Sequence, residues 1–157
     1  KKKFIKTNLT SPDIITIHES LERLKKNKID NVILEASSHG IDQKRLNNLK
    51  FKVGAFTNFS QDHLDYHKNM KSYLNAKLKL FSKLLPKKSY VVTDSSLNEY
   101  SKLKKIIIKR KLRLLDAKNE FDKIKKIPTN LIGALQIRNL SVAVLLARIC
   151  RLKTDKI

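Results

Sequence analysis

Residues 57–81, TNFSQDHLDYHKNMKSYLNAKLKLF, run from a polar segment into a helical pattern that contains an unusual lysine. With about 3.6 residues per turn, one side of this helix is an apolar stripe of Met70, Tyr73, Leu74, Leu80, Phe81 and Leu84. Lys77 falls in the middle of the stripe. The opposite side carries the lysines expected to be solvated, Lys71, Lys79 and Lys83. An amine on an apolar face loses hydration, so Lys77 is expected to be neutralised or paired.

Short apolar runs and helical patterns alternate on both sides of this stretch. The predicted strands are residues 31–34, 51–56, 89–92 and, more weakly, 111–115. The predicted helices are residues 14–24, 42–49, 70–84, 97–110 and 132–152. This order predicts an α/β fold in which helices cover both faces of a parallel sheet.

Polar segments follow three of the predicted strands, at residues 35–39, 58–67 and 93–95. The carboxyl ends of parallel strands share one edge of the sheet, where ligands bind. We therefore expect these segments to form an active-site face.

The first helix has a start signal in Thr10, Ser11, Pro12 and Asp13. A hydroxyl cap, a proline at the first helical position and an acid in the first turn are typical of a helix start. Residues 35–40 are expected to form a loop, and residues 118–126 show no clear pattern.

Length and composition are typical of one globular domain, because the chain has 157 residues of which 41% are hydrophobic. The net charge of +21 makes nucleic-acid binding a class to consider. Most of the excess is lysine, which lacks the bidentate fork of arginine, and we expect no nucleic-acid partner. The single cysteine, Cys150, fits a reducing cytoplasm and a place in the core. No apolar run reaches about 18 residues, so no membrane partner is expected either.

Two candidate metal sites have ordinary alternatives, and one nucleotide-binding motif does not occur. Glu35 follows a predicted strand and suits Mg²⁺, although an acid there can also cap a turn. His63 and His67 have i, i+4 spacing, but the absence of HExxH and of a nearby cysteine makes zinc a weak hypothesis. No GxxxxGK[ST] motif occurs, so a phosphate-binding loop, if one is used, is expected before Lys1.

Two longer segments resemble the MurE-type Mur ligases. VILEASSHGIDQKRL is similar to the family's EVSSHGL…QxR segment, and FTNFSQDHLDYHKNMKSYLNAKLKLF is similar to its FTNLSxDHLDYHxxMExYxxAKxxLF segment. LTSPDIITIHESL resembles its TTPD segment, and LIGALQIRNLSVAVL resembles its GxFNxxNxLAA helix. The family adds the third residue of the peptidoglycan stem peptide.

The resemblance implies a three-layer, P-loop-NTPase-like central domain formed by residues 1–157. It implies that this domain is incomplete, without its first strand and P-loop, and that the N-terminal UDP-binding and C-terminal domains are absent. We expect such a fragment to be monomeric, cytoplasmic and inactive alone.

The resemblance also assigns residue roles. Lys77 matches a lysine that CO₂ converts to a carbamate, and Glu35 and His63 match the other Mg²⁺ residues, so the implied catalytic residues are Lys77 and His63. The implied binding residues for the UDP-MurNAc-dipeptide are Thr10, Ser11, Ser37, Gln43 and Arg45. Asn139 matches an asparagine near the adenine of ATP. Asp65 and His67 are expected to shape the loop.

The implied reaction is ATP-dependent amide formation through an acyl phosphate, with Mg²⁺ as cofactor and an amino acid as the second substrate. The sequence departs from the family at Leu9 and Gln136, where asparagines are usual, and is short between residues 96 and 131. Two alternatives stay open: another Mur-type or folylpolyglutamate synthase-like ligase, and a lysine-rich nucleic-acid-binding domain.

Overall fold

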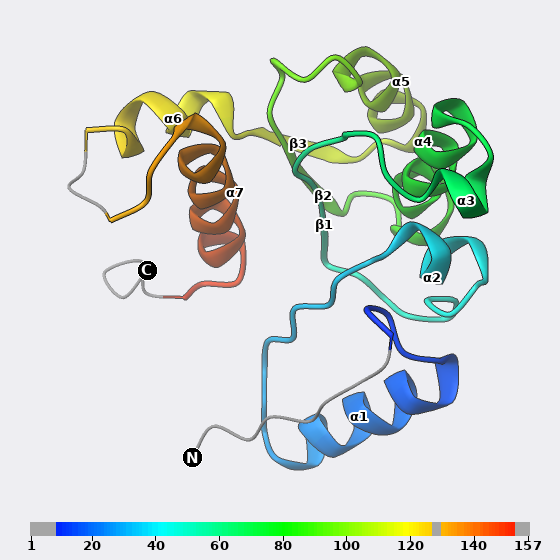
Figure 1. Ribbon diagram of the computed structural model, residues 1–157. Coiled ribbons are helices and arrows are strands. Elements are labelled where there is room, and N and C mark those ends of the chain that lie inside the picture. The colour runs from blue at the N-terminus through cyan, green and yellow to red at the C-terminus, as the bar shows by residue number, and fades with distance from the viewer. Residues whose placement is uncertain (1–8, 127–129, 153–157) are drawn as a thin grey trace. The chain divides into compact units, whose positions relative to one another are not determined.

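The computed structural model describes residues 9–126 and 130–152, and they group into two compact units (Figure 1). Unit 1 contains the described residues up to 49 together with residues 62–80, and unit 2 contains residues 50–61 and the described residues from 81 onward. No helix in the described ranges combines the length and the apolar character that a membrane span requires.

Unit 2 is organised around three parallel strands in the order β1 (Val53–Phe56), β2 (Tyr90–Thr93) and β3 (Arg113–Asp116). The register places Val53 beside Tyr90 and Tyr90 beside Arg113. The hydroxyl of Thr93, which is fully buried, donates to the carbonyl of Phe56 over 2.9 Å. The three strands predicted at residues 51–56, 89–92 and 111–115 are therefore confirmed, with shifts of one or two residues at their ends.

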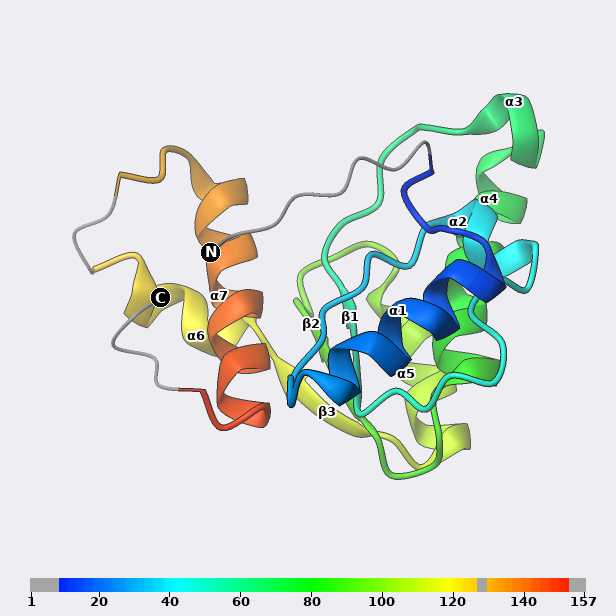
Figure 2. The same ribbon diagram turned by 90° about the horizontal axis from the view of Figure 1, so that it is seen from below.

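Helices cover both faces of this sheet, as Figures 1 and 2 show. One face carries α5 (Tyr100–Arg110), which buries Leu103 and Ile107. The other carries α7 (Ala134–Ile149), which contacts β1 and β2 and packs against α6 (Lys118–Ile124). An apolar cluster on the α7 side contains Val92, Ala117, Val142 and Leu145. The predicted three-layer α/β fold is confirmed for the part of the chain that the structure describes.

Unit 1 consists of four helices and their connections: α1 (Ile14–Lys26), α2 (Ser38–Asp42), α3 (Leu64–His67) and α4 (Met70–Lys79). Both α2 and α3 pack against α4. The Asn69 side chain caps α4 by accepting from the backbone N–H of Ser72 over 2.9 Å. The helix predicted at residues 70–84 is confirmed as far as Lys79, and a π-helical segment, Leu80–Leu84, follows it.

The predicted start of the first helix is wrong in detail. Asp13 is the N-cap, because its side chain accepts from the backbone N–H of Thr16 over 3.0 Å. Pro12 therefore lies outside the helix. Ser11 is buried and bonded elsewhere, which leaves the carboxylate as the group that satisfies the first free N–H groups.

The strand predicted at residues 31–34 is also wrong. In the described chain this segment forms no ladder, and the side chains of Val32 and Ile33 are 47% and 88% exposed. An apolar run forms a strand only where another strand pairs with it and its faces are covered.

Other helix boundaries differ as well. The predicted loop at residues 35–40 contains the start of α2, since Ser37 caps that helix by accepting from the N–H of Gly40. The helix predicted at residues 42–49 is a series of turns. Residues 118–124, which show no clear sequence pattern, form α6.

Candidate functional site

Lys77 lies on α4 between buried neighbours and is itself half-buried. Its Nζ lies 5.2 Å from the centre of the Tyr73 ring. Burial lowers the pKa of Lys77, while the negative charges of Glu35 and Asp62 act in the opposite direction. The anomaly predicted from periodicity is therefore confirmed, because this lysine has lost hydration that surface lysines keep.

The two carboxylates near Lys77 come from different segments. Glu35 is exposed and follows the extended residues 31–34, and Asp62 precedes α3. Asp62 accepts from the backbone N–H of His63 over 2.8 Å, and its other oxygen lies 3.4 Å from His63 Nε2. The His63 ring also meets the Tyr73 ring edge-on, with centroids 5.7 Å apart. The structure thus brings His63 and Lys77 to the Tyr73 ring and places Glu35 and Asp62 within electrostatic reach of Lys77.

A cation in this place would find the carboxylates of Glu35 and Asp62 near the amine of Lys77. Among the described residues, no group of three or more His, Cys, Asp or Glu side chains is arranged to hold a metal ion. His63 and His67 therefore form no zinc site with a third such ligand in this part of the chain. A neutral or protonated amine adds no oxygen donor, but a carbamate would add two. A carbamate at Lys77 would therefore give this place more of the oxygen donors that Mg²⁺ prefers.

Rings join the DHLDYH segment to the SSHG segment. The His39 ring lies 4.8 Å from that of His63, 4.2 Å from that of Tyr66 and 5.4 Å from that of His67. His67 stacks on Tyr73 and is only 7% exposed, and its Nε2 makes no hydrogen bond. Burial is the main cause that lowers the pKa of His67, and His39 and His63 add to it. A neutral, buried His67 suits the loop-shaping role that the resemblance implies.

Ser11 and Ser37, two predicted substrate residues, bond to each other and to the backbone. Ser11 Oγ donates to the carbonyl of Glu35 over 2.8 Å, and the N–H of Ser37 donates to Ser11 Oγ over 3.0 Å. A side chain at Gly40 would come within 2.7 Å of Ser11 Cβ, so this close approach requires glycine. Thr10 is exposed next to this junction. The two serines therefore fix the position of Glu35.

A polar chain connects the other predicted substrate residues to α4. Arg45 donates to the Ser11 carbonyl over 2.7 Å and also to the side-chain oxygen of Gln43. Gln43 Nε2 donates to the Tyr66 hydroxyl over 3.4 Å, and that hydroxyl donates to Asp42 over 3.2 Å.

Asp42 completes this chain through an ion pair with Lys79. The pKa of Asp42 is lowered, chiefly by its hydrogen bond from Lys79. Lys79 keeps contact with solvent, as predicted, because its side chain is 39% exposed, but its ion pair with Asp42 was not expected. The sequence did not indicate that Asp42, Tyr66 and Lys79 interact, because their partners lie more than 20 residues away in the chain.

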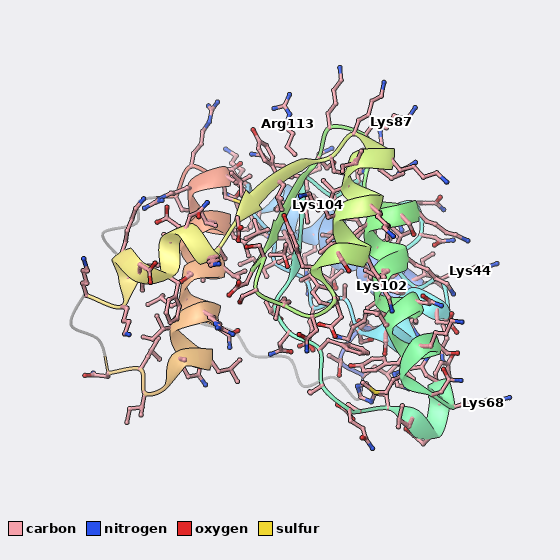
Figure 3. All side chains as sticks on the ribbon, turned by 90° about the horizontal axis from the view of Figure 1, so that it is seen from above. Lys44, Lys68, Lys87, Lys102, Lys104 and Arg113 are labelled. Atoms are coloured by element: carbon pink, nitrogen blue, oxygen red, sulfur yellow. The ribbon has the colours of Figure 1, made fainter. Side chains whose placement is uncertain are left out.

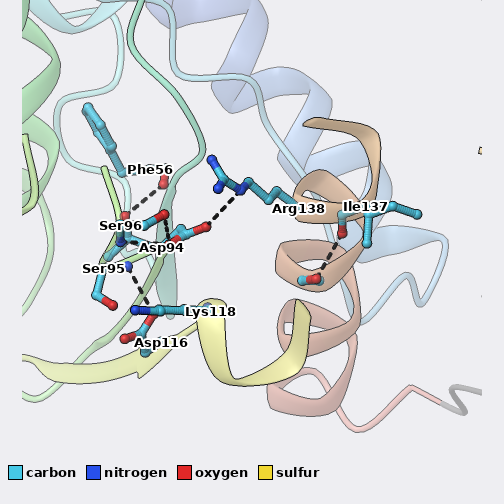
Figure 4. Close-up of polar contacts among 10 residues, drawn as sticks. Phe56, Asp94, Ser95, Ser96, Asp116, Lys118, Ile137 and Arg138 are labelled. Atoms are coloured by element: carbon cyan, nitrogen blue, oxygen red, sulfur yellow. Dashed lines mark hydrogen bonds and ion pairs between the residues drawn. The ribbon is translucent and has the colours of Figure 1, made fainter. Parts of the chain in front are cut away.

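Asn139, the predicted ATP residue, lies half-buried on α7 in unit 2. Its neighbour Arg138 pairs with the buried carboxylate of Asp94 over 3.4 Å (Figure 4). The Arg138 guanidinium also lies over the Phe121 ring. This ion pair links the first turns of α7 to the carboxyl end of β2.

Two carboxylates accept hydrogen bonds from the polar segment that follows β2. Asp94 accepts from the N–H and the hydroxyl of Ser96 over 2.8 and 2.6 Å. Asp116, at the end of β3, accepts from the N–H groups of Ser95 and Lys118, each over 3.0 Å (Figure 4). These carboxylates therefore stabilise turns at the carboxyl edge of the sheet.

The chain is similar in sequence to one family of known proteins. The sequence model of the Mur ligase middle domain matches residues 1–125. A protein of Rickettsia bellii named UDP-N-acetylmuramoyl-L-alanyl-D-glutamate–2,6-diaminopimelate ligase is 45% identical over 107 residues, which is 68% of this chain and 23% of that protein. A protein of the same name from Leptospira interrogans is 34% identical and covers 90% of this chain, and 33% of its own length is matched.

A solved structure of a ligase of this name has the same fold. It superposes with a TM-score of 0.74 over 90% of this chain and 34% of that one, at 20% identity. The chain thus spans between about a quarter and a third of the length of these proteins.

Proposed function

Because the chain belongs to the Mur ligase family, whose middle domain matches residues 1–125, we propose that it is the central part of an ATP-dependent amide-bond ligase. The ligase would add the third amino acid to UDP-MurNAc-L-Ala-D-Glu during peptidoglycan synthesis. The observation that carries this proposal is the half-buried Lys77, which has a lowered pKa and lies near Glu35 and Asp62.

The lowered pKa of Lys77 supports its conversion to a carbamate. Only the unprotonated amine has a free electron pair, and burial increases its fraction at neutral pH. The amine nitrogen would bond to the carbon of CO₂ and release one proton, giving an anion. The charge at Lys77 would change from positive to negative.

Glu35, His63 and the Lys77 carbamate would hold Mg²⁺, with Asp62 orienting His63 through its contact with Nε2. When bound, Mg²⁺ supplies positive charge that neutralises the phosphate and carboxylate oxygens. The Ser11–Ser37 junction holds the chain that carries Glu35 in place.

The polar chain that begins at Ser11 suits the UDP-linked substrate. Arg45 has a planar fork that matches a carboxylate or phosphate, and Gln43 holds one of its nitrogens. Thr10, Ser11, Ser37 and Gln43 would add neutral hydrogen bonds. Asn139 would contact the adenine, held by the Arg138–Asp94 pair.

The reaction would proceed in two steps. The terminal carboxylate of the substrate would take the γ-phosphoryl group of ATP, giving an acyl phosphate and ADP. The amine of the incoming amino acid would then attack the acyl carbon, and phosphate would leave. The names of the relatives make 2,6-diaminopimelate our candidate for that amino acid. We place the reaction in the cytoplasm.

Replacement of Lys77 in the intact ligase tests the proposal. We expect Lys77→Ala to lower turnover by about three orders of magnitude or more, because positioned charge is worth this much in catalysis. Acetate should restore part of the activity by supplying a carboxylate. Lys71→Ala, which removes an exposed lysine from the same helix, is the control and should leave turnover unchanged. Normal turnover of Lys77→Ala would refute the proposal.

A further inference from the structure

Charge is unevenly distributed over unit 2. Its described acidic residues lie at or beyond the carboxyl ends of β2 and β3: Asp94, Glu99, Asp116, Glu120 and Asp122. Residues 50–61, 81–93 and 100–115 contain no acid at all. The amino ends of the three strands are preceded or opened by Lys50, Lys52, Lys87, Lys88, Lys111 and Arg113.

Backbone hydrogen bonds hold the lysines at this edge side by side. The N–H of Tyr90 donates to the carbonyl of Lys52 over 3.2 Å. The N–H of Lys88 donates to the carbonyl of Lys111 over 3.1 Å. Lys52, Lys88 and Lys111 are all exposed, and Lys87 and Arg113 extend from the same end of the unit (Figure 3). Segments far apart in the sequence therefore present their cations together.

The last turns of α5 extend this basic edge. Arg110 donates to the carbonyl of Leu85, just before Lys87, over 2.9 Å. Lys104, which Figure 3 labels, is exposed on the same helix, and so are Lys105 and Lys109. Ile108, one turn from Lys104 and Lys105, is an apolar side chain that is 67% exposed. We call the set of Lys52, Lys87, Lys88, Ile108, Lys109, Lys111 and Arg113 the amino-edge surface.

Two ordinary explanations leave part of the amino-edge surface unexplained. Cations near the end of α5 offset the helix dipole, but Lys52, Lys87 and Lys88 lie outside that helix. A lysine-rich composition supplies many cations, but it does not account for the separation of acids from bases within one unit. Among the described residues, no ion pair joins a cation of this surface to a carboxylate.

We propose that the amino-edge surface binds the face of a membrane that contains anionic phospholipids. Lysines on flexible stems are attracted to such a face without any fixed geometry. Ile108, among these lysines, would enter the boundary between headgroups and acyl chains. A single-stranded nucleic acid fits less well, since Arg113 lies over the Tyr90 ring that would otherwise be free to stack on a base. The binding is peripheral and needs no membrane-spanning helix.

Vesicle sedimentation with the full 157-residue chain tests this proposal. The vesicles contain phosphatidylcholine alone or phosphatidylcholine mixed with phosphatidylglycerol. We expect binding only to the mixed vesicles, and a loss of binding as salt increases. The edge variant combines Lys52→Gln, Lys87→Gln and Lys109→Gln. Since each lysine near an anionic face accounts for about a fivefold change in partitioning, this variant should bind about a hundredfold more weakly.

The matched control removes three exposed lysines at the other side of the unit, through Lys118→Gln, Lys125→Gln and Lys126→Gln. It has the same net charge as the edge variant and should bind like the unaltered chain. Ile108→Ser should weaken vesicle binding by about tenfold, because it removes buried apolar area. Far-UV circular dichroism during heating checks that every variant folds.

Several results would overturn the proposal. Absence of binding to the mixed vesicles at low salt would do so, as would an equal loss of binding in the control and edge variants. Tighter binding of an RNA oligonucleotide than of the vesicles, unaffected by Ile108→Ser, would assign the surface to nucleic acid instead. Because no step involves ATP or a sugar nucleotide, these outcomes are independent of the ligase activity.

Discussion

Units 1 and 2 are held together by different kinds of interaction. Unit 2 has strand ladders, two covered faces and fully buried side chains such as Leu103 and Val92. Unit 1 has four helices, of which α2 and α3 are short, and no strand ladder among its described residues. It also buries apolar side chains such as Leu46 and Leu74, but hydrogen bonds and contacts between histidine and tyrosine rings connect its segments as well. Nearly all the candidate catalytic and substrate residues lie in unit 1. The hydrogen bonds and ring contacts of unit 1 hold these polar side chains in place while several of them stay partly open to solvent.

The largest effect is expected when a buried apolar side chain of unit 2 is removed. Leu103 is fully buried on α5, so Leu103→Ala should lower the free energy of unfolding of unit 2 by about 3 kcal/mol. Ile108→Ala on the same helix is the control, because Ile108 is 67% exposed and its loss should cost less than about 0.5 kcal/mol. Urea denaturation followed by circular dichroism measures both. Equal effects would show that α5 does not cover the sheet as described.

The next largest effect is expected in unit 1, where a charged side chain should affect substrate binding. Arg45→Ala in the intact ligase should raise the KM for the UDP-linked substrate by about tenfold or more, with a smaller change in kcat, because a bidentate charged contact is lost. Arg23→Ala, on the exposed face of α1, is the control. Steady-state kinetics at varied substrate concentration gives both constants. An unchanged KM for Arg45→Ala would remove this residue from the substrate site.

A smaller effect is expected at the Asp42–Lys79 ion pair. The pair is partly exposed, so Asp42→Asn should lower stability by about 1 kcal/mol or less. The substitution also leaves one acceptor oxygen where Lys79 and the Tyr66 hydroxyl now each have their own, so the Tyr66 contact should weaken and the KM for the UDP-linked substrate should rise slightly. The matched control is Glu22→Gln, which breaks the exposed pair with Lys26. A KM unaffected by Asp42→Asn would mean that Tyr66 does not position Gln43.

The smallest effect concerns pH. The folded chain holds Lys77 with a pKa below its usual value near 10.5. At a pH between the lowered pKa of the folded chain and the usual pKa of the unfolded chain, Lys77 binds fewer protons in the folded state. The free energy of unfolding should therefore rise as pH increases through this interval. Lys77→Met should reduce this rise and should increase stability at neutral pH. Denaturation midpoints at several pH values measure the slope, and an unchanged slope would contradict the lowered pKa.

The sequence predicted unit 2 better than unit 1, for a physical reason. β1 and β2 are apolar runs with buried residues, and this pattern is local information. β3, with the sequence RLLD and no buried residue, was predicted more weakly. Residues 31–34 look the same in sequence, but whether such a run becomes a strand depends on a partner strand, which the run itself does not encode. The three-layer fold was therefore predictable, whereas the absence of a strand at residues 31–34 of unit 1 was not.

The candidate site was predictable where a residue broke a local pattern. Lys77 stands out because it interrupts an apolar stripe. Asp42, Tyr66 and Lys79 break no pattern, and their partners are distant in the chain. The roles of Glu35, His63 and Asn139 came from the family resemblance and stay predictions. The amino-edge surface likewise emerges only when the parallel register brings three lysine-bearing segments to one edge.

Carbon-13 NMR of the chain in ¹³C-labelled bicarbonate tests the carbamate of Lys77 most directly. Our account predicts a carbamate carbon signal in the unaltered chain that disappears in Lys77→Ala and persists in Lys71→Ala. A signal that is absent from the unaltered chain, or that survives in Lys77→Ala, would contradict it.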